Sequence, residues 1–309
     1  METVNMTPEQ LKAFEKAEKK KNRIPNLFEM IWREIWRDKF AFTSLVVMIG
    51  VLLAAIIGGA IYDGMEINFN RVILGQQNLS PSEFGPLGTD SGGRPIIAQL
   101  FMGARNSLVI AFTVTLASLF IGYLVGLISG FYGGFLDLVI MRLIDMLVMV
   151  PFLMALIVVS QVLPRYGIPQ FIMLMIAFSW FATARTFRAK VLQEAAKDYV
   201  LASKTLGTPN WKIMIKKVLP NVTSFMMVGL VLGLAGNIGI ETGLTVIGFG
   251  LPFGIPSIGS MIASALDPTV LQFRPWQWVP AAILIFAMTL SIYGVGSAIS
   301  RAVNPKQRR

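Results

Sequence analysis

Six long runs without charged residues constrain this chain more than any other feature. Each run holds about 20 residues or more, the length that an α-helix needs to cross the apolar core of a bilayer. The runs cover residues 40–62, 107–136, 146–164, 166–184, 218–240 and 275–300. Composition agrees, because 54% of the residues are hydrophobic and only 14% are charged. The sequence therefore predicts an all-α polytopic membrane protein with six transmembrane helices.

A seventh uncharged run, residues 242–266, is interrupted by the glycines and prolines of "GFGLPFGIPSIGS". Unpaired backbone groups cannot face lipid, so we expect residues 242–274 to form an outer re-entrant or surface segment. Positive charge supports six spans. Lys and Arg number nine up to Lys39, eight in 185–217 and four from Arg301 onward. These residues concentrate on the cytoplasmic side, and only an even number of spans places all three groups, and both termini, there.

The missing residue types exclude most chemistry. The chain has no cysteine and no histidine, which excludes disulfides, the usual zinc sites and the Ser-His or Cys-His nucleophiles. It also lacks the G-x-x-x-x-G-K-[ST] loop that cradles nucleotide phosphates. We therefore expect no catalytic residue, no metal site and no cofactor bound by this chain. The net charge of +10 favours anionic membrane lipid over nucleic acid as a partner.

The segments between the runs give the expected domain layout. Residues 1–39 form a cytoplasmic arm, 40–62 the first span and 63–105 an outer loop rich in turn formers. Residues 106–300 form a core of five spans with a cytoplasmic loop at 185–217, and 301–309 form a cytoplasmic tail. The arm ends in "LFEMIWREIWRDKF", whose apolar residues fall at helical spacing, as in an interfacial helix. The apolar positions are Leu27, Ile31, Ile35 and Trp36. Alternatively, this segment only marks the cytoplasmic boundary of the first span.

Glycines and prolines mark special positions in the spans. The glycines at four-residue spacing are Gly122, Gly126, Gly130 and Gly134 in the second span and Gly229 and Gly233 in the fifth. Such stripes let helix backbones approach closely, so we expect tight helix packing, with lining of a substrate path as the alternative. Pro151 in the third span and Pro280 in the sixth predict kinks.

Few ionisable residues lie in or near the spans, where charges are costly and tend to be paired or functional. Arg142 and Asp145 are three residues apart and can pair on one helix face, with Asp137 nearby. Glu241, at the outer end of the fifth span, has no cation close in sequence. We predict that it pairs with Arg105, at the outer start of the second span.

The cytoplasmic stretch "QEAAKDYVLASKTLGTPNWKIMIKKVLPN" (193–221) has the pattern of two short helices joined by a sharp turn. Small and apolar residues recur at helical steps from Ala195 to Leu206. Gly207 is placed to end that helix, Thr208 to cap the next and Pro209 to fill its first turn. Pro220 is expected to end the second helix at the membrane. A bent lever of this shape suits a groove on a soluble partner.

The same stretch resembles the cytoplasmic coupling loop of ABC importer permeases, with its E-A-A-x-x-x-G pattern and closing L-P. Aligned on Gly207, the family's E-A-A positions fall on Leu201, Ala202 and Ser203, so leucine replaces the family's glutamate.

Four further stretches are similar, in order, to the C-type permeases of the oligopeptide, dipeptide and nickel importer family. They are "IWREIWRDKFAF", "GPLGTDSGGRPIIAQLFMGARNSL", "GFYGGFLDLVIMRLIDMLVMVPFL" and "ETGLTVIGFG". Two departures are Pro95, where an acidic residue is common, and the absence of a tryptophan before Gly259.

The resemblance implies the type I importer fold in a bacterial cytoplasmic membrane and a set of partners. These are a homologous B-type permease, two cytoplasmic ATPases that hold ATP and Mg, and an external binding protein that is lipid-anchored or periplasmic. The implied substrate is an oligopeptide or dipeptide, with nickel or another small solute as the alternative. A self-contained secondary transporter would need carboxylates or histidines at mid-membrane, which this sequence almost lacks.

Overall fold

The computed structural model describes residues 27–63, 71–162 and 166–303. The expected arm up to residue 26 and the end of the expected tail, from residue 304, lie outside these ranges. The described residues form helices and loops, with one isolated β-bridge between Thr89 and Pro95. The α-helices are α2 (Leu27–Arg37), α3 (Lys39–Asp63), α4 (Ile96–Tyr132), α5 (Gly134–Val148), α6 (Phe152–Val162), α7 (Ile168–Ala195), α8 (Asp198–Thr205), α9 (Asn210–Ile213), α10 (Leu219–Val246), α11 (Ile258–Ala263), α12 (Pro268–Phe273) and α13 (Val279–Val303). The π-helix η1 (Met214–Val218) joins α9 to α10, and η2 (Ser264–Leu266) and η3 (Pro275–Gln277) are 3₁₀ turns.

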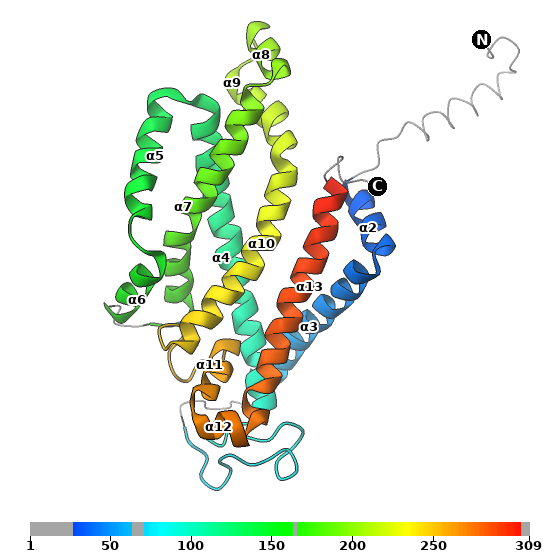
Figure 1. Cartoon of the computed structure of the whole chain (residues 1–309), viewed down its shortest axis with the longest axis vertical. Coiled ribbons are helices and arrows are strands. Elements are labelled where there is room, and N and C mark those ends of the chain that lie inside the picture. Colours follow the sequence, from blue (N-terminus) through cyan, green and yellow to red (C-terminus); the bar gives the residue numbers. More distant parts are fainter. Residues whose placement is uncertain (1–26, 64–70, 163–165, 304–309) are drawn as a thin grey trace, which may run out of the picture.

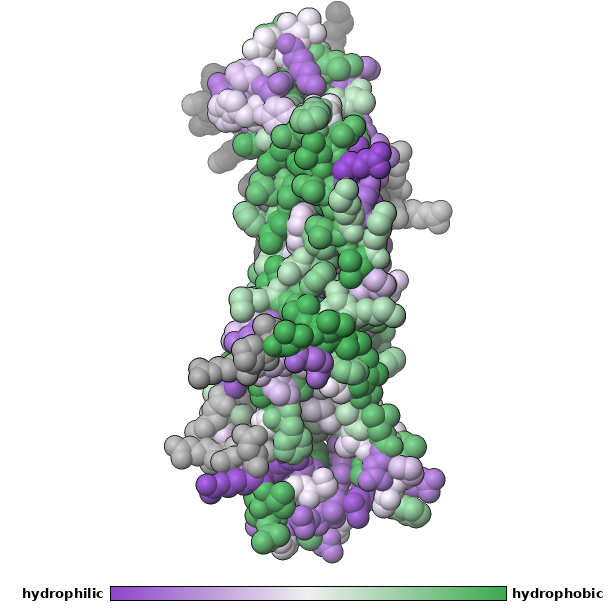
Figure 2. Space-filling model, turned by 90° about the vertical axis from the view of Figure 1, so that its left-hand side faces the viewer, coloured by the Kyte–Doolittle hydropathy of each residue, from purple (hydrophilic) through white to green (hydrophobic). Residues whose placement is uncertain are grey.

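Five helical units among the described residues are long and apolar enough to cross a membrane: α3, α4, α7, the α9–η1–α10 unit and α13. A sixth candidate is α5 with α6, which are bent by 72° at the break between them. Figure 1 shows the long helices running between two ends, which we call the α8 end (with α8 and α9) and the α12 end (with α11 and α12). Figure 2 shows a broad hydrophobic belt between these ends, which are more polar.

The third span differs most from the expected boundaries. The prediction of 146–164 is wrong, because the helical segment starts at Gly134 and continues past the break as α6. Gly133 and Gly134 have φ of +64° and +59°, conformations that suit glycine, and they end α4 at Tyr132. The acidic residues of α5 do not exclude it from the bundle, because arginines of α7 pair with them. Pro151 lies in the break, which confirms the kink predicted there.

Three other helices extend beyond the predicted span boundaries. The helix α4 begins at Ile96 rather than residue 107, α7 reaches Ala195 rather than 184, and α10 reaches Val246 rather than 240. The kink predicted at Pro280 is wrong, because this residue lies in the first turn of α13. Proline is tolerated there, since the first amide groups of a helix have no partner within it.

The helix α4 packs along α7 through its glycines. A methyl group added at Gly126 would lie 2.6 Å from the carbonyl oxygen of Ala184. The corresponding distances are 2.7 Å at Gly122, to Thr183, and 2.8 Å at Gly130, to the carbonyl oxygen of Arg188. These contacts leave no room for any side chain larger than hydrogen, as expected for small-residue helix interfaces.

The other predicted glycine positions divide between packing and a turn. Gly229 and Gly233 of α10 face Tyr123 and Thr115 of α4, with added methyl groups at 2.2 Å and 3.0 Å. Gly134 does not belong to the α4 stripe. It starts α5, and an added methyl group there would meet nothing within 4 Å.

The amphipathic segment before the first span folds against its own chain. In α2, Ile35 is buried with Ala41 of α3 and Ala298 of α13. Arg301, near the end of α13, forms ion pairs with Glu34 and Asp38. Trp36, expected on the apolar face, is 58% exposed. These contacts fix α2 across the ends of α3 and α13, as Figure 1 shows.

Candidate functional site

The helix–turn–helix expected from the sequence lies at the α8 end, where it protrudes beyond the long helices (Figure 1). Gly207 forms its corner with φ +75°. Its amide donates to the carbonyl of Lys204, and the amide of Thr208 donates to the carbonyl of Ser203, at 3.0 and 3.1 Å. An added methyl group at Gly207 would meet nothing within 4 Å, so backbone conformation alone requires glycine within this chain.

The tip of this segment exposes apolar side chains. Leu206 is 84% exposed, and Leu201 and Trp211 are about half exposed. Ala202 is exposed and Ser203 half-buried, whereas Val200 and Ile213 are buried beneath them. Exposed apolar groups beside a rigid corner are typical of a protein-docking surface.

Three details of the predicted segment are corrected. The single helix expected over 195–206 is divided, because Ala195 ends α7 and α8 starts at Asp198. Pro209, not Thr208, occupies the N-cap position of α9. Pro220 does not end a helix: it lies in the first turn of α10, and the chain stays helical from Asn210 to Val246. The π-helix η1 accommodates the proline, and the side chain of Asn221 donates to the carbonyl of Lys217 at 2.7 Å.

A polar cluster around the buried Glu194 joins α8 to the ends of α7 and α10. The carboxylate of Glu194 accepts a hydrogen bond from the Tyr199 hydroxyl at 2.6 Å and pairs with Lys197 at 2.7 Å. Asn221 donates to the same hydroxyl at 3.0 Å. Burial, together with the hydrogen bond to Glu194, raises the pKa of Tyr199 to about 12, so its hydroxyl stays a donor at neutral pH. The sequence interpretation missed this cluster, because the Tyr199 hydroxyl bonds to Asn221, which lies 22 residues further along the chain.

Two ion pairs join α5 to α7. Arg188 forms a bidentate pair with Asp137, and Arg185 pairs with Asp145. The predicted pair between Arg142 and Asp145 is therefore wrong. The residues are 51 and 40 positions apart in the sequence, so no local signal could have identified the partners.

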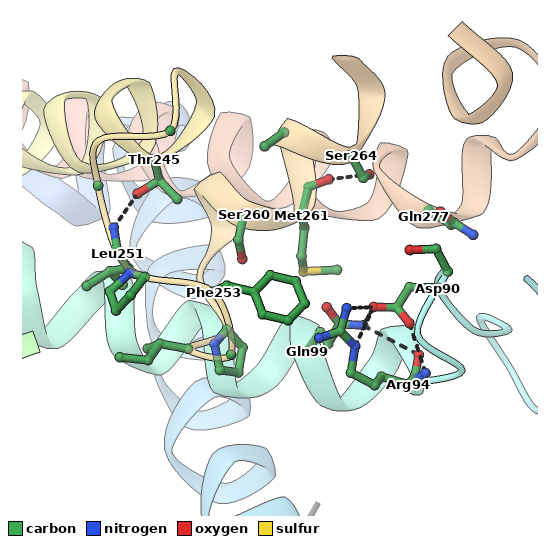
Figure 3. Close-up of a pocket in the computed structure, with 18 of the residues that line it drawn as sticks. Asp90, Arg94, Gln99, Thr245, Leu251, Phe253, Ser260, Met261, Ser264 and Gln277 are labelled. Carbon is green, nitrogen blue, oxygen red and sulfur yellow. Dashed lines mark hydrogen bonds and ion pairs between the residues drawn. The ribbon is translucent and has the colours of Figure 1, made fainter. Parts of the chain in front are cut away.

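A cavity of about 730 Å³ opens at the α12 end between the loop after α10, the start of α4, α11 and residues 90–94. Figure 3 shows Asp90, Arg94 and Gln99 joined on one side of this cavity, with Phe253 in front of them. Asp90 Oδ2 accepts from Arg94 Nε at 2.8 Å and from Gln99 Nε2 at 2.9 Å. The guanidinium carbon of Arg94 lies 5.2 Å from the centre of the Phe253 ring, a cation–π distance.

Hydrogen bonds hold the walls of this cavity. Gln277 donates to Asn78 Oδ1 at 3.0 Å and to the carbonyl oxygen of Thr89 at 3.1 Å, which joins the 71–95 loop to η3. The amide of Leu251 donates to Thr245 Oγ1 at 3.3 Å. Phe253 is 81% exposed, so the cavity combines a fixed polar wall with a large accessible aromatic ring.

Glu241 lies near this cavity and is fully buried. Its carboxylate accepts hydrogen bonds from Ser107 at 2.9 Å, Thr245 at 3.3 Å and Thr242 at 3.4 Å. The predicted pair with Arg105 is wrong, because hydroxyl groups satisfy this carboxylate. The side chain of Arg105 instead lies against Gly59 of α3.

Comparison with known protein families shows which family this chain resembles. Residues 122–309 match the family model described as "Binding-protein-dependent transport system inner membrane component". The chain belongs to this family of transport permeases. Residues 26–81 of the permease also match the model described as "N-terminal TM domain of oligopeptide transport permease C".

Individual relatives of the permease are similar over nearly their whole length. The oligopeptide transport system permease protein OppC of Lactococcus lactis subsp. cremoris is 40% identical over 292 residues, covering 94% of this chain and 99% of the relative. The dipeptide transport system permease protein DppC of Bacillus subtilis is 31% identical over 278 residues, covering 90% and 85%. The oligopeptide transport system permease protein AmiD of Streptococcus pneumoniae is 30% identical over 283 residues, covering 90% and 91%.

The structure places the predicted site residues of this permease in separate regions. Leu201, Ala202, Ser203 and Gly207 lie together at the α8 end, whereas the α4 glycines lie along α7. Among the described residues, no group of three or more acidic side chains is placed to hold a metal ion. The cavity at the α12 end was not expected, although its loop was identified by its glycines and prolines.

Proposed function

We propose that this permease is one membrane subunit of an ATP-driven ABC importer for oligopeptides or dipeptides. The observation that carries the proposal is the 40% identity to an oligopeptide transport permease over 94% of this chain and 99% of the relative. Such coverage extends the similarity to nearly the whole permease rather than to one motif. Nickel or another small solute, moved by the same machinery, is the alternative substrate.

The substrate path requires a second, homologous B-type permease, and an external binding protein delivers the substrate to it. The cavity beside Phe253 supports arrival of substrate at the α12 end, because it is large and has polar and apolar walls. We assign this end to the outside of the cell. The α8 end carries the groups of Lys and Arg around 185–217 and at Arg301, which favours the cytoplasm on that side.

Energy would come from two cytoplasmic ATPases that hold ATP and Mg. The α8–Gly207–α9 segment supports this division, because it protrudes, exposes Leu201 and Leu206, and is fixed at its base by Glu194 and Tyr199. A docked ATPase could then move α7 and α10 as rigid bodies, in a two-state change between inward and outward access.

Gly207→Val tests the coupling role. A left-handed conformation costs a residue other than glycine on the order of 1 kcal/mol, and a β-branched residue more. No transmembrane helix is changed, so we expect normal membrane insertion but less co-purified ATPase and less transport per inserted permease. Gly207→Ala should have a milder effect.

Gly75→Val is the matched control. Gly75 also has a positive φ, of +82°, and also has nothing within 4 Å of an added methyl group, but it lies at the opposite end. The control should keep normal amounts of co-purified ATPase. Normal ATPase binding and transport with Gly207→Val would contradict the coupling role. Uptake of labelled nickel but not peptide by the reconstituted complex would instead contradict the peptide assignment.

A further inference from the structure

A second cavity lies halfway along the bundle, beside the break between α5 and α6. It has a volume of about 400 Å³ and is lined by α4, α7, α10 and the residues around Pro151. Thr115, which lines it, is close to the midpoint of α4. We call this cavity the central hollow. None of its lining residues is charged.

One face of α10 beside the hollow has no side chains. Gly236, Gly239 and Gly243 are exposed, and a methyl group added to any of them would meet nothing within 4 Å. Their spacing of three and four residues places them on the same side of the helix. The α4 glycines differ from them, because those contact α7 directly. Gly236 itself lines the hollow.

Asn237 supplies a polar group to the hollow. Its side chain lines the cavity, and the residue is only 8% exposed. Its Nδ2 donates to Thr115 Oγ1 at 2.8 Å, whereas its Oδ1 accepts no hydrogen bond from any described residue. Protein atoms do not enclose this oxygen, so a ligand in the cavity that brings an N–H group can donate to it.

Two serine hydroxyl groups of the hollow also present acceptors. Ser118 Oγ donates to the carbonyl of Val114, and Ser179 Oγ donates to the carbonyl of Met175, both at 2.6 Å. Their hydrogens are used within their own helices, so their oxygens remain available as acceptors. The hollow therefore offers neutral acceptors and a side-chain-free helix face, which match the N–H groups of an extended peptide.

We propose that the central hollow is a passage subsite that binds the peptide backbone during transport. Backbone N–H groups donate to Asn237 Oδ1 while the peptide's side chains pass over Gly236. Because the lining is uncharged, the subsite would accept peptides of varied sequence. This inference rests on the proposed function, since it assumes a peptide substrate.

The first test changes the space above Gly236. In vesicles containing the full complex and its binding protein, Gly236→Leu should lower uptake of a peptide with bulky side chains. The ratio of its uptake to that of an alanine peptide of equal length should fall about tenfold, equivalent to 1.4 kcal/mol. ATP hydrolysis should remain normal. The matched control is Gly50→Leu, because Gly50 in α3 also has nothing within 4 Å of an added methyl group and lies outside the hollow.

The second test removes the acceptor. Wild-type uptake should favour an ordinary peptide over its backbone N-methylated form, and Asn237→Leu should reduce this preference by several fold, on the order of one hydrogen bond. The binding protein is the same in both measurements, so a changed ratio arises in the permease.

Unchanged ratios in both variants, or loss of complex assembly with Gly236→Leu, would overturn the subsite. If the wild-type complex transports peptide and both variants behave like the wild type, the proposed function stands without the subsite. If the wild type transports no peptide, both fail.

Discussion

At the scale of single residues, the two α5–α7 ion pairs differ in burial. The side chains of Asp137 and Arg188 are 12% and 29% exposed, whereas those of Asp145 and Arg185 are 45% and 49% exposed. Removing one partner of a buried pair leaves an uncompensated charge, but exposed pairs contribute little because water screens them. The pair of Asp137 with Arg188 should therefore carry most of the stabilisation between these helices.

Asp137→Asn should lower the free energy of unfolding by about 3 kcal/mol. Asp145→Asn should cost less than about 1 kcal/mol, which makes it the matched control on the same helix. Thermal unfolding of the purified complex in detergent measures both. The charge-reversed double variant Asp137→Arg with Arg188→Asp should recover part of the loss; equal shifts in the two single variants would contradict this account.

At the scale of elements, glycine contacts determine which helices touch. The α4–α7 interface has backbone-to-backbone approaches at Gly126 and Gly130, and between α3 and α13 an added methyl group at Gly294 would lie 2.0 Å from Ser44 Oγ. In a membrane, close van der Waals packing replaces the hydrophobic effect as the driving force between helices. The same residue type on an uncovered face, as at Gly50, should contribute nothing to packing.

Gly126→Val should separate α4 from α7, because its added carbon would lie 2.6 Å from the Ala184 carbonyl oxygen. We expect a loss of stability of several kcal/mol, comparable with severe overpacking of a core, and less folded permease in the membrane. Gly50→Val should leave both unchanged. Size-exclusion profiles after heating compare the two variants; equal profiles would show that α4 and α7 tolerate greater separation.

At the scale of the whole molecule, the proposed orientation places the α8 end, α2 and the end of α13 on the cytoplasmic side. The ion pairs of Arg301 with Glu34 and Asp38 fix α2 to the end of α13, so α2 and this end should share one side. With α5 and α6 counted as one bent span, the described residues supply six candidate membrane crossings.

Single cysteines test this orientation without background, because the chain has no cysteine. A cysteine at Ser80 should react with an impermeant reagent from outside intact cells. Cysteines at Ser203 and Ser300 should react only after permeabilisation. External labelling at Ser300 would imply an odd number of crossings and would contradict the six-span orientation.

Structural features that depend only on residues close together in the sequence could be predicted from the sequence alone. Uncharged runs identified the five long apolar helices, because each helix satisfies its own backbone hydrogen bonds and needs only length and apolar side chains to cross lipid. They placed the third span wrongly, because α5 contains charged residues. Gly207 and Pro151 identified a corner and a break, because they act through local backbone conformation.

Only the tertiary structure decided the pairings and the cavities. Arg188 lies 51 residues from Asp137, Thr115 lies 122 from Asn237, and Ser107 lies 134 from Glu241. No periodic pattern connects residues so far apart. The local choice of Arg142 for Asp145 and the distant choice of Arg105 for Glu241 were therefore both wrong. The glycines of α4 and α10 look alike in sequence, but their roles depend on whether another helix lies against them.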